Sequence, residues 1–344
     1  MISPNYSKDK YTKNVGADCM YLKNLCSVSI WFRVILILSV SLWGCSKDTI
    51  DKTETINYDN LSGKMAFSRS EGKIVIIDAD KKNTTTITTK DNASLWEASV
   101  SLSPDGNMVA YAAYHYTYDL YQLFTMSVGG GNYAQLTSNS WHSFCPIWNA
   151  DGTQLFYIYG ASNTGQIYNI MSNGSNNSKI TDFEAYGRIS VSKNGNLLVF
   201  ASGELGSPKG IFLYDIRKDS LTQIIPNDST NSAYSPVLSP DEQKIVFILR
   251  HGFNEQGTSP YFFKIMIVNM DGSDEKMVVE LPFVSYIDDT YVTWSPDGTK
   301  LAFNYGSGMN DDQWSHIFLI NSDGSDLTQI THNTNYDGAP SWIK

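Results

Sequence analysis

Short apolar runs alternate with polar turns along most of the chain. The runs are six or seven residues long, rich in β-branched and aromatic residues, and bounded by Gly, Asp, Asn or Pro. Composition and length of this kind are typical of β-strands rather than helices. The clearest runs start at Met108, Leu155, Leu197, Lys244 and Lys300. The pattern predicts an all-β chain of antiparallel strands joined by tight turns.

One turn phrase precedes each of these runs. Its five copies are Leu102–Gly106, Trp148–Gly152, Val191–Gly195, Leu238–Glu242 and Trp294–Gly298. In the fullest copies an apolar residue ends a strand, Ser and Pro open the turn, Asp bonds back to the backbone, and Gly accepts a positive φ. Successive copies are 46, 43, 47 and 56 residues apart. This spacing predicts the four-stranded blades of a β-propeller.

The two ends of the chain complement each other. The segment Lys64–Thr88 has the second to fourth strands of a blade, whereas Gly338–Ile343 has only a first strand. Joining them gives a six-bladed β-propeller, closed by pairing of the C-terminal strand with the N-terminal blade. The 282 residues from Gly63 to Lys344 then supply 47 residues per blade.

The repeated phrases D-x-x-P-x-W-S-P-D-G and N-x-D-G-S-x-x-x-x-x-T resemble blades of the TolB-type, WD40-like propeller family. The resemblance covers about four fifths of the chain. It implies a propeller that binds partners, gates a peptidase or belongs to a lyase. Between Cys45 and Gly63 there is no room for the N-terminal α/β domain of TolB, and no G-x-S-x-G nucleophile elbow occurs.

The first 44 residues have the pattern of a secretory signal. Lys23 and Arg33 precede the apolar run 34–43, which is too short to span a bilayer as a finished helix. The sequence Leu-Trp-Gly-Cys at 42–45 resembles a bacterial lipobox and predicts lipid attachment at Cys45. Met20 is an alternative start, and an uncleaved anchor helix is the alternative to cleavage.

This leader divides the chain into a signal (1–44), a lipidated Cys with a flexible polar tether (45–62) and the propeller (63–344). We therefore expect a bacterial envelope location, lipid-anchored at the outer membrane and facing the periplasm or the cell surface. Only Cys145 remains beyond Cys45, so no intramolecular disulfide can form. We interpret Cys145 as a buried core residue.

Charge restricts the partners. The chain carries −10, and the part after residue 44 carries −13, which argues against binding of nucleic acid. We expect a monomer with an envelope protein or peptide as its partner and without a cofactor.

An acidic arc at one channel mouth is the first candidate site. In a blade the longest loops lie on the rim opposite the repeated turns, and such loops commonly carry binding residues. On three consecutive blades the connectors to the first strand place Asp289, Asp337 and Glu97 at equivalent positions, with Asp288 adjacent. These carboxylates either cap the backbone of their own connectors or receive a cation or a basic peptide.

Histidines and aromatic residues extend this rim. His142 lies in a connector and Trp314 in a long loop, so both are further binding candidates. The five histidines reproduce no known ligand spacing, and we expect no metal site. The repeat tryptophans Trp148, Trp294 and Trp342 are interpreted as packing residues between blades.

No nucleophile with its base, phosphate loop or catalytic carboxylate pair is present in the sequence. It predicts a non-catalytic, lipid-anchored envelope propeller that binds a protein or peptide at its loop-rich rim. The alternative is a protein that binds or cleaves glycans, similar to oligogalacturonate lyases. The sequence does not decide whether the protein has an enzymatic activity, although a non-catalytic role is favoured.

Overall fold

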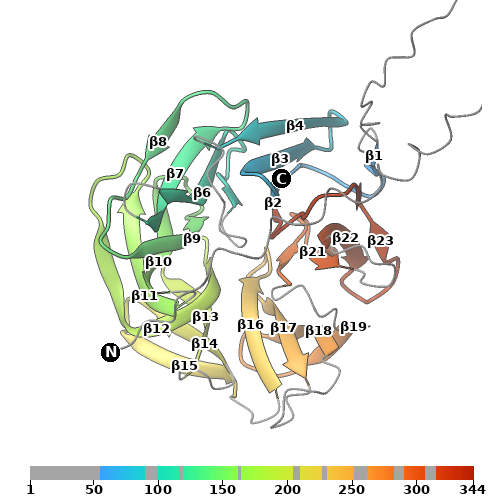
Figure 1. Cartoon of the computed structure of the whole chain (residues 1–344). Helices are drawn as coiled ribbons and strands as arrows, with labels where there is room; N and C mark the ends of the chain where they lie inside the picture. The colour runs from blue at the N-terminus through green and yellow to red at the C-terminus, as the bar shows by residue number, and fades with distance from the viewer. Residues whose placement is uncertain are drawn as a thin grey trace, which may run out of the picture. The chain divides into compact units, whose positions relative to one another are not determined.

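The computed structural model describes residues 55–89, 100–115, 119–161, 164–203, 210–226, 231–251, 262–282, 290–306 and 315–344. All of them belong to the compact unit that begins at Asp51. Every regular element among the described residues is a β-strand, arranged in sheets around a common centre (Figure 1). Within this described part, no helix has the length and apolar character needed to cross a bilayer. The all-β propeller expected from the sequence is confirmed.

Four four-stranded antiparallel sheets can be traced among the described residues. The first contains β25 (Ser341–Ile343), β2 (Lys64–Arg69), β3 (Lys73–Asp78) and β4 (Asn83–Thr88). The second contains β5 (Ser101–Leu102), β6 (Met108–His115), β7 (Leu120–Ser127) and β8 (Tyr133–Gln135). The third contains β16 (Asn231–Leu238), β17 (Lys244–His251), β18 (Phe262–Asn269) and β19 (Lys276–Pro282). The fourth contains β20 (Val292–Trp294), β21 (Lys300–Gly306), β22 (Ser315–Asn321) and β23 (Thr328–Gln329).

The remaining region differs from the expected series of separate four-stranded blades. A seven-stranded sheet contains β9 (His142–Trp148), β10 (Gln154–Ala161), β11 (Thr164–Met171), β12 (Ser178–Val191), β13 (Leu197–Ser202), β14 (Gly210–Asp215) and β15 (Ser220–Ile225). The cause is β12, whose first half pairs with β11 and whose second half pairs with β13. The register shifts between Tyr186 and Ile189, where Gly187 has a φ of +64°. A strand of 14 residues therefore continues through a bend where the sequence suggested a break.

The two ends of the described chain meet in the first sheet. β25 pairs with β2, so that Trp342 lies opposite Met65. The indole of Trp342 donates a hydrogen bond to the Ser62 carbonyl at 2.6 Å, and its side chain is buried. Apolar residues of β2 and β3 share one core cluster with Ala302, Ile317 and Leu319 of the fourth sheet.

The segment predicted to be a tether is shorter than expected. β1 (Thr55–Ile56) pairs with β24 (Thr331–His332), and Ile56, Tyr58 and Leu61 pack against the core of the first sheet. The Tyr58 hydroxyl also lies 2.6 Å from the Thr84 hydroxyl. Three apolar side chains spaced two and three residues apart suffice to hold this polar segment on the sheet.

Inner strands of neighbouring sheets are tied by recurring hydrogen bonds. The Trp148 indole donates to the Ser101 carbonyl and the Trp294 indole to the Val237 carbonyl, both at 3.1 Å. The inner strands contact one another in the order β25, β5, β9, β12, β16, β20 and back to β25. They enclose the central channel, the space around which the candidate sites lie.

Candidate functional site

The repeated turns form a rigid face at one end of the inner strands. In the turns at 103, 239 and 295 the serine hydroxyl donates to the Asp carboxylate two residues later, at 2.5–2.6 Å. The same serine oxygen accepts the amide of the following strand, at 2.8–2.9 Å. These hydroxyl and amide donors hold the pKa values of Asp105, Asp241 and Asp297 below their usual range. The carboxylates therefore remain charged at neutral pH.

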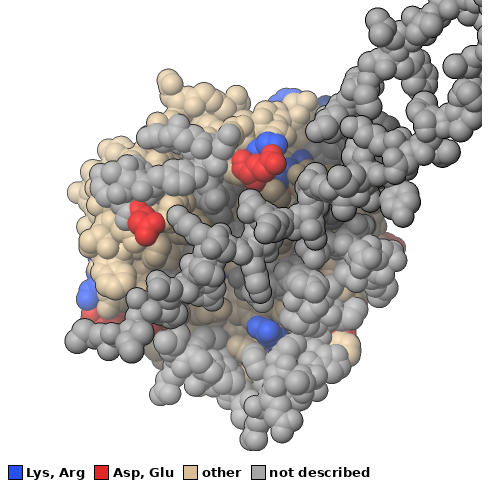
Figure 2. All heavy atoms as spheres, viewed as in Figure 1, with Lys and Arg blue, Asp and Glu red and all other residues tan. Residues whose placement is uncertain are grey.

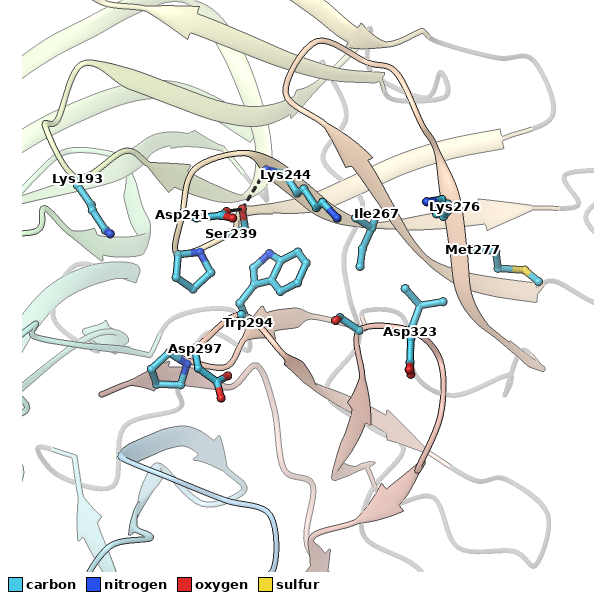
Figure 3. Close-up of a pocket in the computed structure, with 15 residues that line it drawn as sticks. Lys193, Ser239, Asp241, Lys244, Ile267, Lys276, Met277, Trp294, Asp297 and Asp323 are labelled. Atoms are coloured by element: carbon cyan, nitrogen blue, oxygen red, sulfur yellow. Dashed lines mark hydrogen bonds between the residues drawn. The ribbon is translucent and has the colours of Figure 1, made fainter.

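A large hollow lies on this face. It has a volume of about 520 Å³ and separates the third sheet from the fourth. We call it the lysine groove and define it by Lys193, Lys244, Lys276, Met277, Trp294 and Asp323. Figure 3 shows Trp294 between the turns that carry Asp241 and Asp297, with Lys193 near one end and Met277 near the other.

The chemistry of the lysine groove is mixed. Trp294 and Ile267 are buried at its floor, whereas the Met277 side chain is 55% exposed. Three lysines and three aspartates, Asp241, Asp297 and Asp323, line the groove, and Lys276 is paired with Asp274 at 2.9 Å. Such a groove can accept an extended segment that carries apolar side chains and both signs of charge.

A second groove of about 510 Å³ repeats this geometry between the second sheet and the seven-stranded sheet. It is lined by Trp148, Pro104, Asp105 and Asp151, but no lysine is among its described lining residues. Both grooves therefore arise where a repeated turn and a repeat tryptophan, Trp294 or Trp148, line the space between neighbouring sheets. The lysines and the exposed methionine distinguish the lysine groove from its counterpart.

The central channel forms a third hollow of about 240 Å³ that opens between the turns. Residues of all six inner strands, β5, β9, β12, β16, β20 and β25, line it. Arg188 and Lys193 are its charged lining residues among those described, and no carboxylate is present in the described lining. Sequence reasoning missed Arg188, although its position in the repeat holds smaller or uncharged residues in the other copies, such as Cys145, Ser235 and Ala339.

Of the predicted rim residues, Asp337 is fully buried. Its carboxylate accepts hydrogen bonds from Arg69 Nε at 2.6 Å, Arg69 Nη2 at 3.1 Å and Asn333 Nδ2 at 2.8 Å. It thus pairs with the first sheet instead of capping amides of its own connector. A charge held in this way is not available to an incoming ligand.

His142 lies at the start of β9 and is half-buried. Its Nδ1 accepts a hydrogen bond from the Tyr121 amide at 3.1 Å, and burial lowers the pKa of the imidazole. The contact links β9 to β7. Cys45, Glu97, Asp288, Asp289 and Trp314 lie outside the described residues.

The described residues were compared with the requirements of a metal site and of a reactive thiol. No group of three or more His, Cys, Asp or Glu side chains lies close enough there to hold a metal ion. Cys145 is buried in β9, with a φ of +53°. On the face drawn in Figure 2, the visible charged side chains of described residues are few and lie apart from one another.

The comparisons with known proteins agree with this architecture. The family model described as TolB beta propeller domain matches residues 63–283. TolB from Acinetobacter baumannii is similar in structure, with a TM-score of 0.66 and 16% identity over 82% of this chain and 66% of that chain. A putative TolB from Agrobacterium tumefaciens has a TM-score of 0.56 and 20% identity over 71% and 86%. A chain of a nidogen/laminin complex has a TM-score of 0.61 and 10% identity over 81% and 98%. No curated protein matches the chain in sequence.

Proposed function

The chain belongs to the TolB β-propeller family, and we propose that it is a non-catalytic envelope lipoprotein whose propeller binds a protein or peptide. The observation that supports binding most directly is the lysine groove. Its floor is formed by buried strands and hydrogen-bonded turns, so a partner can dock without the protein paying to order its own residues. The exposed Met277 supplies an adaptable apolar contact, and flanking lysines and aspartates supply specificity.

The loop-rich rim forms a second proposed surface. Its candidates Glu97, Asp288, Asp289 and Trp314 are predicted from the sequence, and they could receive a basic segment of the same partner. Replacing Glu97 with Gln, and Asp288 and Asp289 with Asn, removes three charges while leaving the buried Asp337 unchanged. A fall in partner affinity with unchanged thermal stability would support this surface.

An affinity comparison tests the binding function. The protein from residue 46 onward is immobilised and incubated with envelope extract and, separately, with a glycan array. We expect a protein partner that Met277→Glu weakens at least tenfold, because the substitution places a charge in the apolar part of the groove. Leu327→Glu is the matched control, since Leu327 is similarly exposed but does not line the groove. Equal retention by both variants would contradict a role for the groove.

A glycan-binding or glycan-cleaving function is the second proposal. The observation that favours it is Trp141, whose side chain is 52% exposed and therefore available to stack on a sugar ring. Retention of glycans on the array, lost in Trp141→Ala and kept in Met277→Glu, would establish this alternative in place of the first.

Lipid anchoring at the envelope rests on the lipobox that ends at Cys45. Diacylglyceryl attachment to this residue would tether the propeller to a membrane without a membrane-spanning helix. Cys45→Ser should abolish palmitate incorporation and leave an uncleaved precursor. Incorporation that persists in the variant would show that the lipobox assignment is wrong.

We also propose that the propeller has six blades closed by β25. Two observations support this count: the inner strands contact one another in a cycle of six, and β12 contributes to both halves of the seven-stranded sheet. In this interpretation the seven-stranded sheet consists of two blades that share β12.

A further inference from the structure

Arg188 occupies an unusual position for a cation. It lies on β12, faces the central channel and is only 7% exposed. Its Nη1 donates to the carbonyl oxygen of Pro340, the residue before β25, at 2.9 Å and to that of Val292 in β20 at 3.4 Å. One side of the guanidinium is thereby fixed across the channel.

The other side of this guanidinium is open. Within the described residues neither Nε nor Nη2 of Arg188 donates a hydrogen bond, and no carboxylate pairs with it. The neighbours that influence its pKa are Cys145 and Tyr291, and neither of them is a carboxylate. Burial lowers the pKa of the Arg188 guanidinium, which nevertheless stays protonated in proteins. A buried cation without a counter-charge is costly, and an anion in the channel would offset that cost.

The cavity around Arg188 suits an anion with further donors. Ser190 and Ser341 also line it, and their hydroxyl oxygens accept the amides of Leu238 and Leu102, each at 3.1 Å. A serine hydroxyl that accepts one hydrogen bond can also donate its own proton. Ser190 lies two residues after Arg188 along β12 and therefore projects to the same side of the strand.

We propose that the channel binds a carboxylate, held side-on by the Nε and Nη2 edge of Arg188. The two N–H groups of this edge are parallel and match the two oxygens of a carboxylate. Lys193 adds a second positive charge to the cavity lining. A volume of about 240 Å³ admits a small organic acid or the end of a peptide, but not a folded domain.

Two sources could supply this carboxylate, and matched probes distinguish them. One pair of probes is succinate and succinamide; the other is the peptide Gly-Gly-Leu with a free or an amidated C-terminus. Inorganic sulfate serves as a tetrahedral anion of similar charge. Binding to the chain from residue 46 onward is measured by calorimetry in 50 mM salt. The result does not depend on the proposed partner, because no partner is present.

We expect at least one carboxylate probe to bind at least tenfold more tightly than its amide. Arg188→Met should lower its affinity at least tenfold, and Arg188→Lys should lower it too, because a single ammonium cannot reproduce the parallel donors. Lys218→Gln changes an exposed lysine that lines neither the channel nor the lysine groove, and this variant should bind as the native chain does. Binding of succinate alone indicates a free acid; binding of the peptide acid indicates a chain terminus.

Several results would overturn the proposal. They are binding of neither carboxylate probe, equal binding of acid and amide, sulfate binding as tight as that of the carboxylates, and retention of affinity in Arg188→Met. Because Arg188 also donates hydrogen bonds to the Pro340 and Val292 carbonyls, Arg188→Met can fail to fold. The comparison of acids with amides on the native chain then decides the question without any substitution.

Discussion

The buried pair of Arg69 and Asp337 joins the last connector of the chain to its first sheet. The carboxylate is inaccessible to solvent, and the guanidinium donates to both of its oxygens. A buried ion pair contributes little against an apolar replacement of both partners, but loss of one partner leaves a buried charge poorly compensated.

We therefore expect Asp337→Asn to lower the free energy of unfolding by roughly 2–4 kcal/mol. The double variant Arg69→Met with Asp337→Leu should be less destabilised than Asp337→Asn, because it buries no charge. Urea unfolding monitored by tryptophan fluorescence measures both. A loss below about 0.5 kcal/mol in Asp337→Asn would contradict the role of the pair.

The turn carboxylates predict the response of the protein to acid. The pKa values of Asp105, Asp241 and Asp297 are lowered in the folded state from the ordinary value of 3.8, so the unfolded chain takes up protons first. Their contribution to stability is complete above that pH and is lost as the pH falls through the lowered values.

Replacing all three with Asn should flatten the decrease in stability between about pH 5 and pH 3. Unfolding free energies at pH 6, 4 and 3 provide the test. An acid response as steep as that of the native protein would mean that other groups dominate.

Single residues also show the limits of the sequence. The Ser–Asp–Gly turn chemistry was predictable, since each turn is built from five consecutive residues. Arg69 and Asp337, which form the ion pair, are 268 residues apart in the sequence. The hydrogen-bond partners of Arg188 are 104 residues (Val292) and 152 residues (Pro340) away from it. Contacts between residues so far apart in the sequence depend on how the sheets are arranged in space, and no local sequence pattern indicates them.

At the scale of elements, β1 extends the folded region into the polar segment after Cys45. The sequence of this segment is mostly polar, and the spacing of Ile56, Tyr58 and Leu61 does not by itself assign them to one face of a strand. Their packing on the core was therefore not predicted. At β12 the sequence repeat suggested two separate strands, one in each of two blades. The structure instead has one continuous strand that pairs with β11 and with β13.

The packing of β1 can be measured through Tyr58. Tyr58→Ala removes a half-buried ring and its bond to Thr84, and should cost about 1–2 kcal/mol of unfolding free energy. Asp59→Ala changes the exposed neighbour and should cost less than about 0.5 kcal/mol. Equal stability of the two variants would indicate that the segment behaves as a tether from Cys45 to residue 62.

On the scale of the whole molecule, β25 connects the end of the chain to its beginning. Trp342→Ala removes a buried indole between sheets and should lower stability by about 3–5 kcal/mol. Deletion of residues 338–344 should also expose the edge of β2 and promote aggregation. Deletion of Lys344 alone is the control. A melting temperature of the longer truncation within a few degrees of the control would contradict closure through β25.

The central claim is that a partner protein binds the lysine groove of the intact protein. The most direct measurement is site-specific photo-crosslinking in living cells, with a photoreactive residue in place of Met277 in the lysine groove or of Leu327 outside it. The account predicts one dominant crosslinked protein from position 277, none from position 327, and loss of the product when Lys244 and Lys276 are replaced with Gln. Absence of a product at 277, or the same products at both positions, would contradict binding of a partner at the lysine groove.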